Sequence, residues 1–372
     1  MRIFDGHNDM LQRVVAAGAS GPDLFLRGDG AGHLDLPRMR AGGFAGGFFA
    51  IWIPERWYAA AGGVVPPADI PPYAHALPAE IGHDAALPQA FAQAAALFSL
   101  ERTGALSICR TAEDLRAAMD AGRIAAILHM EGAEAVRDPD ALTVWHAMGL
   151  RSLGPVWSRP TRYGHGVPFA FPSSPDTGEG LTPAGIALVR ACNTLRIMVD
   201  LSHLNEKGFE DVARISDAPL VASHSAVHAI APSSRNLTDR QLRQIAESGG
   251  LVGLNFAISF LRPDGHRIAA PGIDLMLRHL DHLLGLLGEG GVALGADFDG
   301  ALLPSDLPHA GALPALVDAM RRRGYADELL ERICWRNWVG VLERTWDGAR
   351  EDRILPGAMK GAGVTQQGRG AE

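Results

Sequence analysis

The stretch Arg2-Ile3-Phe4-Asp5-Gly6-His7-Asn8-Asp9 decides the interpretation of this chain, because a short apolar run ends there in a histidine and a carboxylate. In a β-strand, residues i and i+2 point to the same side, so His7 and Asp9 can bind one metal ion. Such triplets also occur by chance. The prediction therefore depends on whether similar groups recur along the chain.

Histidines and carboxylates do recur at the C-terminal ends of later apolar segments. They occur in Leu128-His129-Met130-Glu131-Gly132, Val199-Asp200-Leu201-Ser202-His203, Val221-Ala222-Ser223-His224-Ser225 and Leu294-Gly295-Ala296-Asp297-Phe298-Asp299. In a parallel (β/α)8 barrel the C-terminal ends of the strands converge on one rim, where active sites lie. The repetition predicts a metal site at the mouth of such a barrel.

Eight segments have the length and apolar character of strands, and helical patterns alternate with them. This alternation is typical of an α/β fold with a parallel sheet. We expect strands at 2–9, 43–53, 124–131, 152–158, 197–203, 220–224, 251–256 and 292–297, and helices at 183–195, 238–248 and 273–287. The sequence therefore predicts a (β/α)8, TIM-type barrel.

We expect a single domain over residues 1–350, followed by a C-terminal tail at 351–372. Residues 59–110 hold a Gly/Pro-rich loop and a long Ala-rich helical stretch, which predicts an insertion after the second strand. A second long loop, 159–180, is dense in Pro and Gly. Loops of this length at a barrel rim usually shape a pocket.

The composition excludes several classes of protein. With 372 residues, 47% of them hydrophobic, the chain can bury a large core; its net charge is −8 and no Lys/Arg stripe occurs, so we expect no nucleic-acid partner. No apolar stretch reaches the ~18 residues that cross a bilayer, and the first residues lack a signal-peptide h-region, so we expect a cytoplasmic protein. Cys109, Cys192 and Cys334 are far apart and show no Cys-x-x-Cys pairing, which excludes a zinc ribbon and disfavours a disulfide framework.

The predicted rim carries a mixed set of nitrogen and oxygen ligands, which suits Zn²⁺, with Mn²⁺, Fe²⁺ or Co²⁺ as alternatives. The set consists of His7, Asp9, Glu131, His203, His224 and Asp297. It exceeds what one tetrahedral ion needs. Two ions roughly 3.5–4 Å apart, bridged by a carboxylate and a water, use it fully, and the bridging water would become the nucleophile.

These residues also carry a family resemblance. The chain resembles the renal (membrane) dipeptidases, peptidase family M19, a branch of the amidohydrolase-type metal-dependent barrels. The resemblance extends from residue 5 to about residue 337 and rests on Asp-Gly-His-Asn-Asp at 5–9, Glu-Gly at 131–132, Asp-Leu-Ser-His at 200–203, Ser-His-Ser at 223–225, Ser-Arg-Asn at 234–236 and Gly-Ala-Asp-Phe-Asp-Gly at 295–300. It implies a zinc-dependent dipeptidase that tolerates a D-residue at the C-terminal position, and a homodimer by analogy.

The resemblance also implies how the metals are held. His7 and Asp9 would bind one zinc ion, His203 and His224 the other, and Glu131 would bridge the two. All five lie at the ends of predicted strands, as the barrel interpretation requires.

The resemblance assigns two further roles. Asp297 would move a proton from the bridging water to the leaving amine, and Arg235 would bind the C-terminal carboxylate of the substrate. Asp299 could face the same side as Asp297, but it fits a turn or a residue that orients a ligand better. Glu134 follows Glu131 closely and is the alternative bridge, while Arg235 could instead cap the next helix.

At two positions the sequence departs from the family pattern. Trp157 stands at the end of the fourth strand, where mammalian-type enzymes carry a substrate-contacting histidine, and Phe260 aligns with a substrate-facing tyrosine. An indole donates one hydrogen bond but carries no positive charge. His165, in the following loop, either substitutes for the missing histidine or is an ordinary loop residue.

Three functions remain open at this point. The first is a dipeptidase acting on small dipeptides. The second is an amidohydrolase with the same scaffold that acts on an N-acyl amino acid, a lactam or a lactone, which the changes at Trp157 and Phe260 suggest. The third, a non-catalytic metal-binding barrel, is disfavoured because the ligand set is intact.

Overall fold

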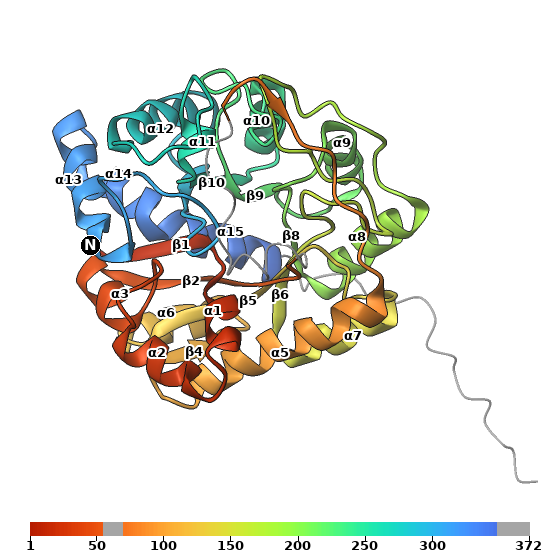
Figure 1. Ribbon diagram of the computed structural model, residues 1–372, viewed down its shortest axis with the longest axis horizontal. Helices are drawn as coiled ribbons and strands as arrows, with labels where there is room; N and C mark the ends of the chain where they lie inside the picture. The colour runs from red at the N-terminus through yellow and green to blue at the C-terminus, as the bar shows by residue number, and fades with distance from the viewer. Residues whose placement is uncertain (55–69, 348–372) are drawn as a thin grey trace, which may run out of the picture.

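Eight parallel strands form a nearly closed barrel at the centre of the molecule, in a computed structural model that describes residues 1–54 and 70–347 (Figure 1). Their order is β8-β6-β5-β2-β1-β11-β10-β9, and a bridge between Asp200 and Val221 links the two ends. The strands are β1 (Ile3–Asn8), β2 (Phe44–Trp52), β5 (Ile124–Glu131), β6 (Leu150–Gly154), β8 (Met198–Val199), β9 (Val221–Ser225), β10 (Leu251–Asn255) and β11 (Val292–Gly295). The predicted barrel is confirmed.

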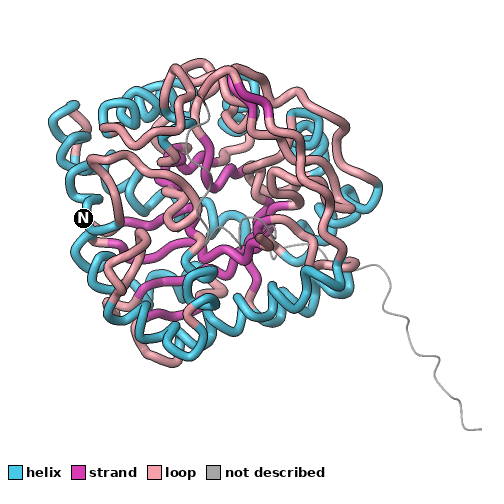
Figure 2. The backbone as a smooth tube through the Cα atoms, viewed as in Figure 1, coloured by secondary structure: helices cyan, strands magenta, loops and turns pink. Residues whose placement is uncertain are grey.

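Helices surround the strands on the outside, as the cyan and magenta segments of Figure 2 show. They are α1 (Met10–Ala16), α2 (Gly21–Arg27), α3 (Leu36–Gly42), α5 (His83–Glu101), α6 (Ala112–Asp120), α7 (Pro139–Met148), α8 (Pro183–Leu195), α9 (Glu206–Ile215), α10 (Asp239–Glu247), α11 (Ile258–Leu261), α12 (Ile273–Leu287), α13 (Leu313–Arg323), α14 (Asp327–Glu331) and α15 (Asn337–Trp346). Short 3-10 turns lie at Gly18–Ser20 and Ala310–Ala312, and a π-helical turn at Arg332–Arg336.

The predicted helix starts are set by side-chain caps. Thr182 accepts the N–H of Gly185 at the start of α8, with Pro183 in the first turn, and Thr238 forms a capping box with Gln241 at the start of α10. A capped start satisfies backbone N–H groups that the helix itself leaves unpaired. The third predicted helix, α12, has the expected bounds.

Two predicted strands are shorter than expected, and in both cases the residues that follow the strand lie at the barrel rim. β6 ends at Gly154 because Pro155 has no N–H to donate to a neighbouring strand. β8 ends at Val199. Beyond it, a single bridge joins Asp200 to Val221, and the side chain of Asp200 accepts the N–H groups of Ser202 and Ser223. The polar residues that follow therefore lie on turns.

Part of the predicted insertion joins the central sheet as an additional strand. β4 (Leu106–Ile108) pairs in parallel with the start of β5, which the sequence analysis missed. β3 (Tyr73–Ala74) pairs antiparallel with β7 (Ala170–Phe171), and this ribbon lies away from the central strands in Figure 2. Residues 59–69 of the insertion, and the predicted tail, lie outside the described residues.

The N-terminal ends of the strands enclose an aromatic cluster, here called the barrel floor and formed by Phe4, Phe48 and Trp338. Trp338, on α15, is fully buried, lies 4.9 Å from the Phe48 ring and donates its Nε1–H to the Leu294 carbonyl. A Cβ at Gly6 would lie 2.5 Å from the Trp338 ring, so glycine is needed there for close approach. The floor closes the barrel beneath the predicted site.

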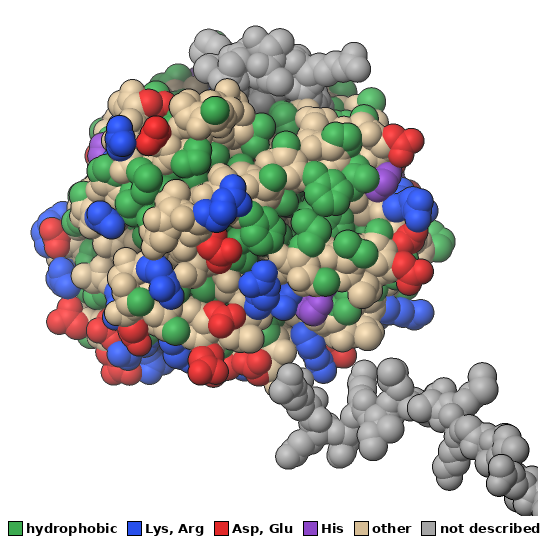
Figure 3. Space-filling view, turned by 90° about the horizontal axis from the view of Figure 1, so that it is seen from below, with side chains coloured by type: hydrophobic (Ala, Val, Ile, Leu, Met, Phe, Trp, Pro, Cys, Tyr) green, Lys and Arg blue, Asp and Glu red, His purple; other side chains and the backbone are tan. Residues whose placement is uncertain are grey.

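The outer surface includes exposed apolar side chains on α5 and α7. Helix α5 carries no charged residue between Asp84 and Glu101, and Phe91 on it stacks on Trp145 at 5.1 Å. Phe91 and Val144 are exposed, and hydrophobic side chains gather near the middle of the face in Figure 3. Among the described residues, no helix combines the length and apolar character needed to cross a membrane.

Candidate active site

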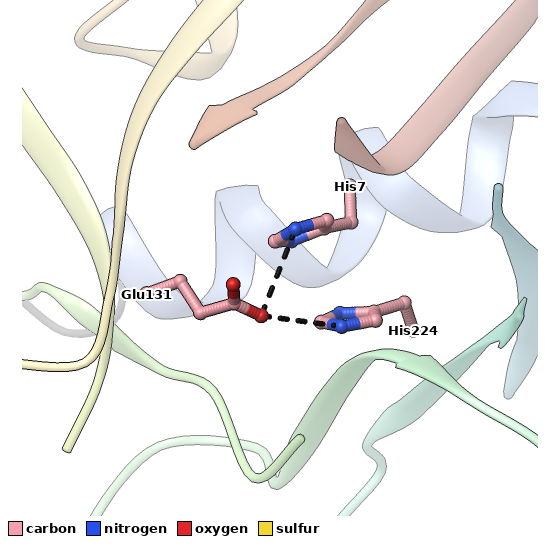
Figure 4. Close-up of side chains that lie close together, drawn as sticks. All are labelled: His7, Glu131 and His224. Atoms are coloured by element: carbon pink, nitrogen blue, oxygen red, sulfur yellow. Dashed lines mark ion pairs between the residues drawn. The ribbon is translucent and has the colours of Figure 1, made fainter. Parts of the chain in front are cut away.

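Side chains from separate strands converge on one carboxylate oxygen at the barrel rim. Oε1 of Glu131, at the end of β5, lies 3.0 Å from His203 Nε2, 3.3 Å from His224 Nε2 and 3.6 Å from His7 Nε2. Figure 4 shows how His7, from β1, and His224, from β9, point at this carboxylate. Each of these four side chains is buried.

A second group of ligand atoms adjoins the first. His7 Nε2 lies 3.6 Å from Asp9 Oδ2, and ligand atoms of His7, Asp9 and Asp297 all lie within 4.8 Å of one another. His7 therefore belongs to both groups. All five residues predicted to bind metal, together with Asp297, are brought to one place, although α1 begins directly after Asp9 and the chain turns sharply there.

The imidazole of His224 is held in one tautomer by a chain of hydrogen bonds. Ser223 Oγ donates to Asp200 Oδ2, so its lone pairs face His224 Nδ1, 2.8 Å away. His224 Nδ1 must then carry the proton, and its Nε2 presents a lone pair toward Glu131. A histidine arranged in this way is ready to bind a metal ion.

His203 has a comparable hydroxyl neighbour. Its Nδ1 lies 2.8 Å from Ser158 Oγ, and its Nε2 lies 3.2 Å from His224 Nε2. Burial lowers the pKa of both His203 and His224 well below the ordinary value, and the positive charges of Arg235 and His7 add to this effect. This lowering favours the neutral ring, which is the form that binds metal ions.

The rim contains buried polar atoms for which the described residues supply no hydrogen-bond partner. They include Nδ1 and Nε2 of His7, Oδ1 of Asp9 and Oε1 of Glu131. Leaving one such group unpaired costs about 1–3 kcal/mol, and more when it is charged. Imidazole nitrogens and carboxylate oxygens that face each other without donors fit a divalent metal ion.

The electrostatics of the ligand set agree with this. Burial alone would lower the pKa of His7, but the nearby Glu131 and Asp9 carboxylates outweigh it and raise the pKa to about 10. Burial raises the pKa of Glu131 well above its ordinary value, opposed by the charge of His7. A proton on His7 thus supplies the positive charge that the carboxylates require, and a bound metal would supply it instead.

Asp297 is fixed in an uncommon backbone conformation beside these groups. Its φ of 60° lies in the left-handed region, and Asn255 Nδ2 donates to its Oδ2 at 3.1 Å. A Cβ at Gly300 would lie 2.1 Å from Asp9 Oδ2 and 2.4 Å from Asp297 Oδ1, so only glycine fits there. Burial raises the pKa of the Asp297 carboxyl, while the charge of His7 opposes the rise.

Asp299 has a different environment. Its Oδ1 accepts the N–H of His33 at 2.6 Å, its own N–H donates to His33 Nδ1, and Arg13 lies 3.4 Å away. These bonds join the loop after β11 to the segment before α3. The geometry favours Asp299 as a residue that holds this loop in place, rather than as the proton-transfer group.

The site opens into a cavity of about 500 Å³, a volume within the range of small-molecule sites. Trp157 lies on its wall, 5.1 Å from the ring of Trp52 and 5.6 Å from that of Phe169. Phe260 also lines the cavity and stacks on Phe169 at 6.2 Å. The wall beside the ligand groups is therefore aromatic and apolar.

Two predicted substrate-binding residues lie outside the cavity lining. Arg235 is buried, and its guanidinium lies over the ring of Phe260. Its Nη1 donates to Ser225 Oγ and its Nη2 donates to the His224 carbonyl. Its Nε has no hydrogen-bond partner among the described residues. His165 is half-buried, and its carbonyl accepts the N–H of Asn205. Its role as a replacement for the family histidine gains no support from this position.

Several residues with clear roles in the geometry were not assigned one from the sequence. Asp200 stood in a quoted motif, but nothing in that motif showed that its carboxylate joins β8 to β9. Asn255 ends β10 with no charged neighbour in sequence, and Ser158 lies in a loop. Only the folded arrangement shows that these side chains contact Asp297 and His203.

Comparison with known proteins gives a consistent result. The family model described as membrane dipeptidase, peptidase family M19, matches residues 1–353. A metallo peptidase from Rhodobacter sphaeroides, solved with a phosphinate mimic of the dipeptide L-Ala-D-Ala, is 56% identical and has a TM-score of 0.89, covering 93% of this chain and 99% of that one.

Two further relatives extend the comparison. An uncharacterized protein from the pqqA 5′ region of Klebsiella pneumoniae is 45% identical over 247 residues, which cover 65% of this chain and 90% of that protein. The probable dipeptidase PvdM from Pseudomonas aeruginosa shares the fold with a TM-score of 0.78 at 22% identity, covering 94% of this chain and 96% of that one.

Proposed function

Because the chain belongs to the membrane dipeptidase family, peptidase family M19, we propose that it is a binuclear zinc enzyme that hydrolyses the peptide bond of small dipeptides. The observation that carries the proposal is the convergence of His7, His203 and His224 on Glu131 Oε1, for which the described residues supply no hydrogen-bond partner. The aromatic cavity beside them has room for a small substrate.

The predicted ligand residues suit two metal ions that share Glu131. We propose that His7 and Asp9 hold one ion, that His203 and His224 hold the other, and that Glu131 contacts both. When bound, such a pair would polarise the scissile carbonyl and lower the pKa of a bound water. Zinc is the simplest ion for this mixture of imidazole and carboxylate ligands.

Asp297 is the proposed proton carrier. Its Oδ2 accepts the Asn255 amide, so Oδ1 is the atom left to take a proton from the attacking water and give it to the leaving amine. Its left-handed backbone and the close approach of Gly300 fix that oxygen beside Asp9. A proton carrier of this kind must be held within hydrogen-bonding reach of the reacting atoms.

The substrate's free carboxylate is proposed to be attracted by Arg235, whose Nε has no hydrogen-bond partner in the described part of the chain. Trp157 and Phe260 favour small or apolar side chains. A D-residue at the C-terminal position fits this scheme, since the Rhodobacter relative was solved with a mimic of L-Ala-D-Ala. The aromatic wall also keeps an N-acyl amino acid as the alternative substrate.

The test is metal analysis combined with a substrate panel. Protein grown with zinc should contain close to two equivalents of metal and hydrolyse L-Xaa-L-Xaa and L-Xaa-D-Xaa dipeptides faster than tripeptides. C-terminal amides should be poor substrates, and Arg235→Ala should remove this preference. Faster hydrolysis of N-acyl amino acids than of any dipeptide would replace the proposal with the amidohydrolase alternative.

A further inference from the structure

A buried ion pair lies behind the aromatic wall of the cavity. Arg159, in the loop after β6, and Glu134, in the loop after β5, both have side chains with no exposed surface. Glu134 Oε1 accepts from Arg159 Nε at 3.0 Å and from Arg159 Nη2 at 2.6 Å. Neither residue belongs to the cavity lining. Glu134, which the sequence left as an alternative metal bridge, is therefore bonded to Arg159 instead.

Arg159 contacts three parts of the rim. Besides its bonds to Glu134, its Nη2 donates at 3.0 Å to the carbonyl of Ile53, the residue that directly follows β2. Its guanidinium carbon lies 5.4 Å from the centre of the Trp157 ring, a distance at which a cation attracts the face of an indole. Arg159 therefore connects the loop after β6 to the ends of β2 and β5, and Trp157 lies next to this junction.

Trp157 is the residue through which the ion pair can affect the cavity, because Trp157 lines the cavity and Arg159 does not. A Cβ at Gly166 would lie 1.8 Å from the Trp157 carbonyl oxygen, so the backbone of Trp157 is closely packed. The orientation of the indole then depends on the groups around its ring. Arg159 supplies a charged contact there, whereas the neighbouring rings of Trp52 and Phe169 are uncharged.

Stability alone does not explain the arrangement of this ion pair. Two N–H groups converge on Glu134 Oε1, while Glu134 Oε2 and Arg159 Nη1 have no hydrogen-bond partner among the described residues. A buried ion pair stabilises a fold little more than apolar residues of the same size do, unless its remaining atoms are also bonded. A Cβ at Gly132 would lie 2.4 Å from Glu134 Oε2, so only glycine lets the carboxylate lie there. The geometry points to orientation of a neighbour as the role of the pair.

We propose that the Arg159–Glu134 pair positions Trp157 in the cavity wall and thereby sets the preference of the cavity for apolar side chains of the substrate. Glu134 holds the guanidinium through two bonds, and the guanidinium holds the indole beside Trp52. An indole fixed in this way presents a constant apolar surface to a bound side chain. The inference rests on the proposed dipeptidase activity, because it concerns the selectivity of the same cavity.

The test uses variants that separate positioning from stability. Arg159→Met keeps an unbranched stem but leaves the Glu134 carboxyl without its partner. The double variant Glu134→Gln/Arg159→Met has no unpaired buried charge, so its Tm should return most of the way to that of the parent protein. Arg151→Met is the matched control, because Arg151 is half-buried near the start of β6 and donates to the carbonyls of Arg110 and His146, away from the cavity lining.

Selectivity is measured with zinc-loaded protein as the ratio of kcat/KM for a Leu dipeptide to kcat/KM for the matching Gln dipeptide. The pairs are L-Ala-L-Leu with L-Ala-L-Gln, and L-Leu-L-Ala with L-Gln-L-Ala. In Arg159→Met and in the double variant, the larger of the two preferences should fall by about 3- to 30-fold, mainly through KM. This is the factor by which loss of a cation–π contact shifts an equilibrium between orientations of the indole. Arg151→Met should keep the ratio of the parent protein.

A second measurement requires no turnover. In protein labelled with 5-fluorotryptophan, the fluorine NMR resonance of Trp157 is identified, among those of the seven tryptophans, as the one that Trp157→Phe removes. This resonance should shift or split in Arg159→Met and in the double variant, and it should keep its position in Arg151→Met. If Arg159→Met does not fold, the double variant carries the same test.

Two results would overturn the inference. A double variant that has both the Tm and the Leu-to-Gln ratio of the parent protein would show that the ion pair only stabilises the fold. A Trp157 resonance that keeps its position when Arg159 is replaced would show that the guanidinium does not orient the indole. If no dipeptide is hydrolysed but the resonance shifts, the proposed activity fails and the positioning of Trp157 by Arg159 stands.

Discussion

The rim and the floor of the barrel are built from the same strands, but they differ in whether their buried polar atoms have hydrogen-bond partners. At the floor, Phe4, Phe48 and Trp338 pack together, and the one polar atom of Trp338 donates to a carbonyl. At the rim, His7 and Glu131 are also buried, but the described residues supply no hydrogen-bond partner for some of their polar atoms. The floor is therefore complete as a packed core, whereas the rim has polar atoms that a bound cation would satisfy.

The largest expected effect is the loss of the metal site itself. Glu131→Ala removes the oxygen that three histidines surround, so metal content and dipeptide hydrolysis should both fall below detection. A chelator should lower the Tm of the parent protein, because a ligand held at 100 times its Kd stabilises a fold by about 2.7 kcal/mol. Metal content is measured by mass spectrometry and Tm by calorimetry.

Measuring Tm with and without the chelator also tests the difference between the rim and the floor. Trp338→Phe should lower Tm by a similar amount with and without the chelator, because the floor does not contact the metal. If the chelator leaves the Tm of the parent protein unchanged, the rim needs no cation and the comparison is wrong.

The next effect should appear in catalysis alone. Asp297→Asn keeps the shape of the side chain and its contact with Asn255, so most of the metal should remain. If Asp297 carries the proton as proposed, its loss should lower kcat by roughly 10²–10⁴-fold. Asp299→Asn is the control, since Asp299 bonds to His33 and Arg13. A larger kcat loss in Asp299→Asn would exchange the two assignments.

At the floor the expected effect is on stability. Trp338→Ala should cost about 3–5 kcal/mol, since it leaves a cavity in a closed core and also removes the donor to the Leu294 carbonyl. Urea unfolding of the metal-free protein measures this cost without a contribution from the rim. A cost below about 1 kcal/mol would mean that α15 does not close the barrel as the packing indicates.

The sequence predicted the rim far better than the floor, and the reason is physical. His7, Glu131 and His224 are polar residues at the ends of apolar runs, where burial demands an explanation. Trp338 is one apolar residue in a helix with many, so no local pattern shows that it enters the barrel. The barrel itself was predictable because strands buried on both faces form continuous apolar runs.

The sequence also could not predict which residues position the proposed site residues. Asn255 contacts Asp297 across 42 positions, and Ser158 contacts His203 across 45. Arg159 begins a loop dense in Pro and Gly and looks like any exposed loop arginine. Its burial depends on the contact of this loop with the loop after β5, 25 positions away, which leaves no local sequence pattern.

The smallest expected effect lies between the two ends, at Ser223. Its hydroxyl joins Asp200 to His224, and its carbonyl would lie 2.2 Å from a Cβ at Gly6, next to Trp338. Ser223→Ala leaves the packing nearly unchanged but removes the acceptor that keeps the proton on His224 Nδ1. Loss of such a bond to a ligand typically weakens metal binding by about 10- to 100-fold.

The matched control is Ser152→Ala, because Ser152 Oγ contacts Nδ1 of His129 at the same 2.8 Å, and His129 is not a proposed ligand. Competition with a coloured chelator should show weaker metal binding in Ser223→Ala and parent-like binding in Ser152→Ala. The pH at which metal is half bound should also rise in Ser223→Ala, because a metal that binds more weakly competes less well with protons for the ligand groups. Equal losses in the two variants would mean that the serines only fill space, and that the rim gains its order from the metal rather than from the strands beneath it.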